Sequence, residues 1–142
     1  MTKKLNILIA AATAFLVVCV LHAVPAAQAG ASGSFSAAQV TRGEAVYATQ
    51  CASCHGLELE GVADLFPALA GATFVQTWQD RSVGELFEKV IVTMPALDPG
   101  SMTPAQTADV VAYMLSVSKY PAGSADLGSD QAALNAIPVG AP

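Results

Sequence analysis

The sequence predicts an all-α domain with three main helices and a short fourth one, and two observations carry this prediction. Apolar residues in the stretch 83–92 recur at i, i+3, i+4, i+7 and i+8, which is the spacing of one helix face. Two capping boxes mark helix starts, one at Ser82 with Glu85 and one at Thr103 with Gln106. These signals place two of the main helices, and the other elements follow from local patterns along the chain.

Residues 1–29 have the pattern of a secretory signal. Two lysines at 3–4 form a positive start, an almost unbroken apolar run covers 5–24, and Ala-Gln-Ala at 27–29 offers a cleavage site. The apolar run is also long enough to span a membrane, so an uncleaved helical anchor is the alternative. We therefore expect a periplasmic protein, which would be membrane-anchored if this segment were retained.

The part of the chain after residue 29 is long enough for one small domain and is strongly acidic. It contains all eleven Asp and Glu residues but only four basic ones, so its formal net charge is −7. Such a chain is not expected to bind nucleic acid or an anionic membrane surface. We expect partner proteins with basic docking faces, and an association with them that weakens as salt increases.

Residues 30–35 are small and polar apart from their last member, and we expect them to form a flexible leader. Ser36 can cap a first helix that runs to about Gln50, although a capping box at 41–44 offers a later start. Gly43 in mid-helix should cost about 1 kcal/mol relative to alanine. It is therefore either a point where another helix crosses closely or a tolerated surface glycine.

Directly after this helix the sequence reads Cys51-Ala52-Ser53-Cys54-His55, a C-x-x-C-H motif. This is the attachment signature of c-type haem. Two thiols on one helical turn can add to the two vinyl groups along one edge of a porphyrin. The histidine then lies beneath the ring, where its imidazole can bind the iron as the proximal ligand. The motif predicts one covalently bound haem c, attached to both cysteines and ligated by His55.

A C-x-x-C pair can also be a redox dithiol or half of a zinc site. A dithiol of the thioredoxin kind belongs to a βαβ setting, and no strand pattern lies near this motif. A structural zinc site needs four Cys and His ligands, but Cys19 and His22 lie in the predicted signal, which leaves only the three of the motif. Covalent haem attachment takes place outside the cytoplasm, so the predicted export supports the haem interpretation.

The glycine-containing stretch 56–72 is a predicted loop, and it offers a partner for the histidine. A proximal histidine normally donates its second ring N–H to a carbonyl or a carboxylate. Pro67 lies within reach and has a rigidly held carbonyl, although it could equally be a plain turn proline. A short helix at 73–79 presents Trp78, whose indole could reach a haem propionate or could simply belong to the core. We place Pro67 and Trp78 in the haem pocket.

The second axial ligand is expected on or near the loop 93–102, which two prolines stiffen. No second histidine exists after residue 29, so a methionine thioether is the natural ligand. Pro95 biases Met94 to an extended backbone, whereas Met102 directly precedes a helix cap, where an apolar residue is commonly a staple. Met114 lies on the packed face of the last helix. We predict Met94 as the iron ligand, with Met102 as the alternative and an open sixth site as a third case.

The last helix is expected to run from the cap at Thr103 to about Ser118, and a tail rich in Ala, Gly and Pro occupies 119–142. Three apolar residues could attach part of this tail to the domain: Leu127, Leu134 and Ile137. Without such contacts we expect the tail to be disordered.

In this order of elements the chain resembles a mono-haem class I cytochrome c, over about residues 36–118. The likeness lies in a first helix that ends in C-x-x-C-H, a loop with Pro67, a middle helix, the pair Met94-Pro95 and a last helix. The resemblance implies the class I fold, in which the helices pack around the covalently bound haem. We therefore treat 36–118 as the cytochrome c domain.

The resemblance also implies roles for individual residues. The carbonyl of Pro67 would accept the proximal histidine's N–H, and Met94 would bind the iron. Gly43 and Tyr47 of the first helix would meet Tyr113 of the last. The Met-Pro…Pro-Gly-Ser loop and the Pro-Ala-Gly tail are similar to cytochromes associated with periplasmic quinoprotein alcohol dehydrogenases.

From this we predict an exported one-electron carrier rather than an enzyme, with His/Met-ligated iron that cycles between Fe(III) and Fe(II). It would carry electrons from a periplasmic dehydrogenase to a terminal acceptor such as an oxidase. The similarity to cytochromes associated with quinoprotein alcohol dehydrogenases implies a quinoprotein as the electron donor. One alternative is a dedicated cytochrome subunit, anchored to a dehydrogenase complex by the segment 5–24. The other is a haem protein whose open site handles peroxide or a small gas.

Overall fold

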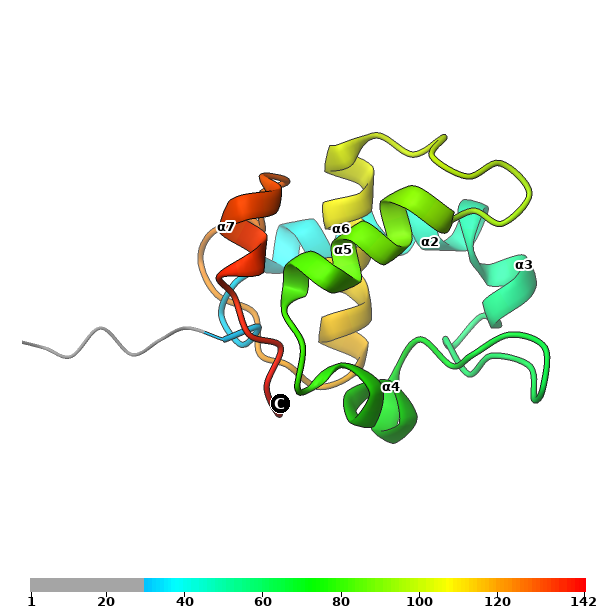
Figure 1. Ribbon diagram of the computed structural model, residues 1–142, viewed down its shortest axis with the longest axis horizontal. Helices are drawn as coiled ribbons and strands as arrows, with labels where there is room; N and C mark the ends of the chain where they lie inside the picture. The colour runs from blue at the N-terminus through cyan, green and yellow to red at the C-terminus, as the bar shows by residue number, and fades with distance from the viewer. Residues whose placement is uncertain (1–29) are drawn as a thin grey trace, which may run out of the picture.

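The computed structural model describes residues 30–142, so the predicted signal, with Cys19 and His22, lies outside the described residues. The described part forms six helices and no β-strand, which confirms the all-α prediction. The helices are α2 (Ala37–Gln50), α3 (Ala52–His55), α4 (Gly71–Trp78), α5 (Val83–Thr93), α6 (Pro104–Val117) and α7 (Gln131–Asn135) (Figure 1). None of the helices in this part is both long and apolar enough to cross a membrane.

The helix starts follow the capping signals. The Ser36 side chain accepts a hydrogen bond from the backbone N–H of Gln39 at 3.0 Å, so α2 begins at the earlier of its two expected starts. Both reciprocal capping boxes are formed, at Ser82 for α5 and at Thr103 for α6. Each box satisfies N–H groups that the first helical turn leaves without a partner, so these signals determine where the helices begin.

Helices α2 and α6 cross in close contact, and Gly43 is the crossing point. A Cβ on Gly43 would lie 1.9 Å from the carbonyl oxygen of Asp109 and 2.9 Å from the Cβ of Tyr113, both on α6. One turn further along α2, the ring of Tyr47 packs against that of Tyr113 with their centroids 5.4 Å apart. Of the two interpretations of Gly43, the close helix crossing is confirmed.

The structure corrects the expectation of a flexible leader at 30–35. Ala31 and Phe35 are fully buried in the core. The backbone N–H of Ala31 donates to the carbonyl of Pro138 at 2.9 Å, and that of Gly33 donates to Pro121 at 2.8 Å. The segment is ordered because its small residues fit closely against the C-terminal tail, a contact that local composition does not reveal.

The tail is ordered as well, so the open question about residues 119–142 is answered. Gln39 on α2 is buried, and its amide donates to the Leu127 carbonyl at 2.9 Å while it accepts from the Leu127 N–H at 2.6 Å. Leu127 and Leu134 are buried. In Figure 1 the tail wraps around one end of the bundle, and α7 packs on α5, where Gly84 leaves room for Asn135.

Gly43→Ala is expected to destabilise the protein, although alanine is intrinsically the better helix former by about 1 kcal/mol. The added methyl group cannot fit beside the Asp109 carbonyl, and such overpacking costs about 1–3 kcal/mol. Thermal unfolding followed by circular dichroism would measure the loss. Gly128→Ala is the control, because a Cβ there meets nothing within 4 Å. Equal melting temperatures for wild type and Gly43→Ala would contradict the close crossing.

Candidate haem-binding site

The C-x-x-C-H motif forms its own short helix at the end of α2. Cys51 ends α2 and begins α3, and its carbonyl accepts the backbone N–H groups of Cys54 at 3.1 Å and His55 at 3.0 Å. One helical turn therefore carries both thiols, and both are free. Burial, with a smaller contribution from Cys54, raises the pKa of the Cys51 thiol to about 11. The turn presents both thiols at the spacing that two porphyrin vinyl groups require.

His55 is buried, and its ring orientation is set by a backbone carbonyl. Its Nδ1 lies 2.9 Å from the carbonyl oxygen of Pro67. Because a carbonyl only accepts, Nδ1 must carry the proton and donate it. The other ring nitrogen, Nε2, then keeps its lone pair for a metal ion, and the hydrogen bond at Nδ1 fixes the orientation of the ring. The structure thus brings His55 and Pro67 together at the contact the sequence predicted.

Two further contacts hold the segment after the histidine, and sequence reasoning missed both. The Tyr47 hydroxyl on α2 donates to the Gly56 carbonyl at 2.6 Å. The ring of Phe66 meets that of His55 edge to face, with 5.9 Å between the centroids. Phe66 directly precedes Pro67, whose carbonyl was the expected partner of His55. This position in the sequence could have indicated that the Phe66 ring lies near the histidine. No sequence signal pointed to the hydroxyl of Tyr47, which was expected only as a packing ring.

The three methionines of the described chain differ in burial. Met102 and Met114 are 5% and 2% exposed and belong to the hydrophobic core. Met94 ends α5 with an extended backbone, φ −123° and ψ 150°, as expected for a residue before proline, and its side chain is only partly buried. The Met94–Pro95 peptide bond is cis.

Trp78, at the end of α4, is also partly buried. Its ring centroid lies 6.5 Å from that of Phe74, and the guanidinium carbon of Arg81 lies 5.2 Å from the indole centroid, within cation–π distance. These neighbours fix the indole in place, while its contact with a haem propionate stays a prediction.

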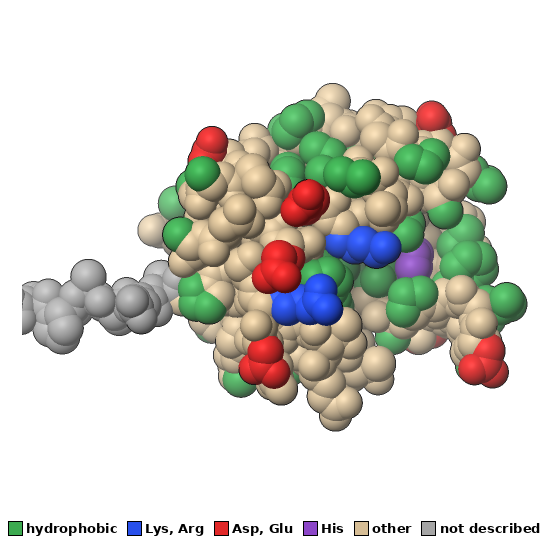
Figure 2. All heavy atoms as spheres, viewed as in Figure 1, with side chains coloured by type: hydrophobic (Ala, Val, Ile, Leu, Met, Phe, Trp, Pro, Cys, Tyr) green, Lys and Arg blue, Asp and Glu red, His purple; other side chains and the backbone are tan. Residues whose placement is uncertain are grey.

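The donor set fits haem c. It combines two free thiols on one turn, an imidazole nitrogen with a free lone pair, and a thioether that the core does not enclose. Figure 2 shows the histidine in a recess of the surface with hydrophobic side chains around it, a setting suited to an apolar ring. Within residues 30–142, no group of three or more His, Cys, Asp or Glu side chains is arranged to hold a metal ion by itself.

Comparison with known proteins identifies the domain. Residues 38–114 match the family model described as cytochrome C oxidase, cbb3-type, subunit III. The chain belongs to this family. It is a mono-haem class I cytochrome c with covalently bound haem c, and a domain of this kind is an electron-transfer unit.

No match is found among curated proteins. Among solved structures, the cytochrome is similar to a chain of the sulfane dehydrogenase SoxCD from Paracoccus pantotrophus, with 25% sequence identity and a TM-score of 0.45. The match covers 61% of this chain and 45% of the SoxCD chain, so the cytochrome spans less than half the length of that relative.

Tyr47→Phe is expected to lower the stability of the cytochrome by about 1 kcal/mol, because it removes the hydrogen bond to the Gly56 carbonyl and leaves that acceptor without its partner. Tyr113→Phe is the matched control, since no hydrogen bond of the Tyr113 hydroxyl is found within residues 30–142. Chemical unfolding of the three proteins would compare the losses. Equal stability of the two variants would show that the Tyr47 hydroxyl contributes nothing.

Proposed function

We propose that the protein is an exported one-electron carrier in which His55 and Met94 are the axial ligands of the haem iron. One observation carries the choice of Met94. Of the three thioethers between residues 30 and 142, it is the only one that the core does not bury. A soft thioether favours ferrous iron and so raises the reduction potential.

The protein's own residues prepare the site for electron transfer. When bound, haem c supplies the one-electron Fe(III)/Fe(II) couple. His55 stays in one orientation because Nδ1 is held by Pro67 and the ring is flanked by Phe66. Cys51 and Cys54 would anchor one porphyrin edge through thioether bonds. Ligands held in the same place in both oxidation states reduce the rearrangement that accompanies each electron transfer.

The acidic charge supports a role between protein partners. After residue 29 the formal net charge is −7, which would steer the carrier toward partners with basic faces. We propose a periplasmic dehydrogenase, with a quinoprotein enzyme as the specific candidate, as donor and an oxidase as terminal acceptor. The periplasmic location rests on the signal-like segment 1–29 and on the extracytoplasmic setting typical of cytochrome c domains.

The absorption spectrum of the purified protein in both oxidation states, with a pyridine haemochrome assay, tests this function. A covalent haem with a weak near-infrared sulfur-to-iron band is the expected result. Carbon monoxide should not bind the reduced protein, because Met94 already occupies the sixth position. Rapid carbon monoxide binding and a high-spin spectrum would instead support the open-site alternative.

Met94→Ala is expected to abolish the sulfur-to-iron band and to lower the reduction potential by on the order of 100 mV, within the roughly 0.8 V range that axial ligands span. Met102→Ala is the control. It should keep the band and the potential but lose about 2–5 kcal/mol of stability, because its side chain is buried. Loss of the band in Met102→Ala, with the band retained in Met94→Ala, would reverse the assignment.

A further inference from the structure

We propose that the loop 56–66 is the docking surface of this cytochrome, and that it binds a redox partner protein through an apolar centre surrounded by lysine and arginine side chains. The proposal rests on the proposed function as an electron carrier and names the surface and the partner chemistry. Below, this segment is called the acidic loop.

The acidic loop exposes large apolar side chains. Leu57 is 79% exposed and Leu65 is 73% exposed, whereas Leu59 between them is only 1% exposed. Of these three leucines, the loop buries only Leu59. Exposed apolar side chains gathered on one element are a common mark of a protein interaction site.

Hydrogen bonds hold these side chains on the outside. The N–H of Gly61 donates to the carbonyl of His55 at 2.8 Å, and Val62 and Phe66 exchange backbone hydrogen bonds of 2.8 and 2.9 Å. The N–H of Leu69 donates to the carbonyl of buried Leu59 at 2.8 Å. A surface this well fixed loses little conformational entropy when a partner binds.

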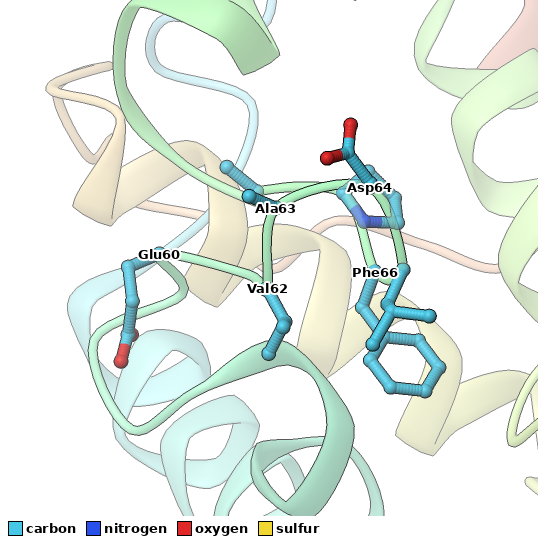
Figure 3. A pocket seen from close by; sticks show the side chains of 8 residues that line it. Glu60, Val62, Ala63, Asp64 and Phe66 are labelled. Atoms are coloured by element: carbon cyan, nitrogen blue, oxygen red, sulfur yellow. The ribbon is translucent and has the colours of Figure 1, made fainter.

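The negative charge of the acidic loop favours a partner with a positively charged surface. It carries Glu58, Glu60 and Asp64, and the whole stretch 56–72 contains no lysine or arginine. In Figure 3 the Asp64 carboxylate points away from the side chains of Val62 and Phe66, and all three residues line the same hollow. Such a surface complements one that has both apolar and cationic groups.

A hollow in the surface is lined mostly by residues of the acidic loop. Its volume is about 440 Å³, and its lining includes the carboxylates Glu60 and Asp64 beside the apolar side chains of Val62, Leu65 and Phe66 (Figure 3). A lysine or arginine side chain suits this lining, because its aliphatic stem packs on apolar groups while its charged end meets a carboxylate.

A cofactor bound at Nε2 of His55 would face away from the acidic loop. Nδ1 of His55 faces Pro67, which directly follows the acidic loop. A group bound at Nε2 lies on the opposite side of the imidazole. The acidic loop therefore stands behind the proximal histidine, and a partner docked there would be one hydrogen bond away from the iron ligand.

The test uses the reduced holoprotein and an oxidised mitochondrial cytochrome c as a cationic protein probe. One electron passes to the probe and no atoms are exchanged, so stopped-flow absorbance gives the second-order rate constant. Glu58→Gln with Asp64→Asn should lower this constant about fivefold to tenfold at low ionic strength. The control, Glu44→Gln with Glu88→Gln, makes the same change in net charge at exposed positions of α2 and α5 and should change it less than twofold.

Apolar contact is tested in the same way. Leu65→Ser should slow the reaction about fivefold, whereas Leu97→Ser, at a side chain that is 97% exposed on another loop, should not. A readout that needs no electron transfer is the shift of backbone amide resonances when the probe is added, and the largest shifts should fall in residues 56–66. Equal effects of both charge pairs, or shifts centred around Leu97, would overturn the docking proposal.

Ferricyanide separates this proposal from the proposed function, because a small anion needs no protein interface. The two charge-pair variants should be oxidised by it at rates similar to each other and no lower than that of the wild type, because both lose the same negative charge, and the leucine variants should match the wild type. All variants should keep the wild-type haem spectrum. If the wild type is not oxidised by ferricyanide, the electron-carrier function fails. If every variant reacts normally with both oxidants, the carrier function stands and the acidic loop is not its docking surface.

Discussion

The hydrogen bond from His55 to the Pro67 carbonyl is the constraint on which the site depends. To form it, the chain must leave the histidine, turn, and return within twelve residues. The turn uses Gly61, whose φ is +70°, and a Cβ there would lie 2.5 Å from the carbonyl oxygen of Phe66. Buried Leu59 fixes the middle of the loop. The conformation of the loop and the tautomer of the imidazole thus both follow from this one hydrogen bond.

A second chain of contacts connects this hydrogen bond to the helices. Gly43 lets α2 approach α6, and that approach brings the ring of Tyr47 onto Tyr113. From this packed position the Tyr47 hydroxyl reaches the Gly56 carbonyl, directly after the proximal histidine. Burial raises the pKa of Tyr47, so its hydroxyl remains a donor at any physiological pH. The helix crossing and the haem motif are therefore parts of one packed unit.

Much of the fold could be predicted because its signals are local. The helix starts at Ser82 and Thr103 rest on side chains three residues away, and the C-x-x-C-H motif is contiguous. The order of residues 30–35 could not be predicted, because Phe35 is buried by tertiary packing and the segment pairs with a tail far along the chain. The Gln39–Leu127 pair was missed for the same reason, since a buried glutamine needs a partner that only the folded chain supplies. The proline after Met94 was enough to rank Met94 above Met102 as the predicted iron ligand. The difference in burial between the two side chains could not be predicted from the sequence and is seen only in the structure.

The pairing of Ala31 with Pro138 brings the two ends of the described chain side by side. In Figure 1 these ends lie at the pole of the molecule away from α3, which carries the haem motif. A linker attached at either end would therefore hold the cytochrome by the same pole and turn the motif outward. On an electrode, such a linker would leave the electron-transfer side open to dissolved partners, and the choice of terminus would matter little.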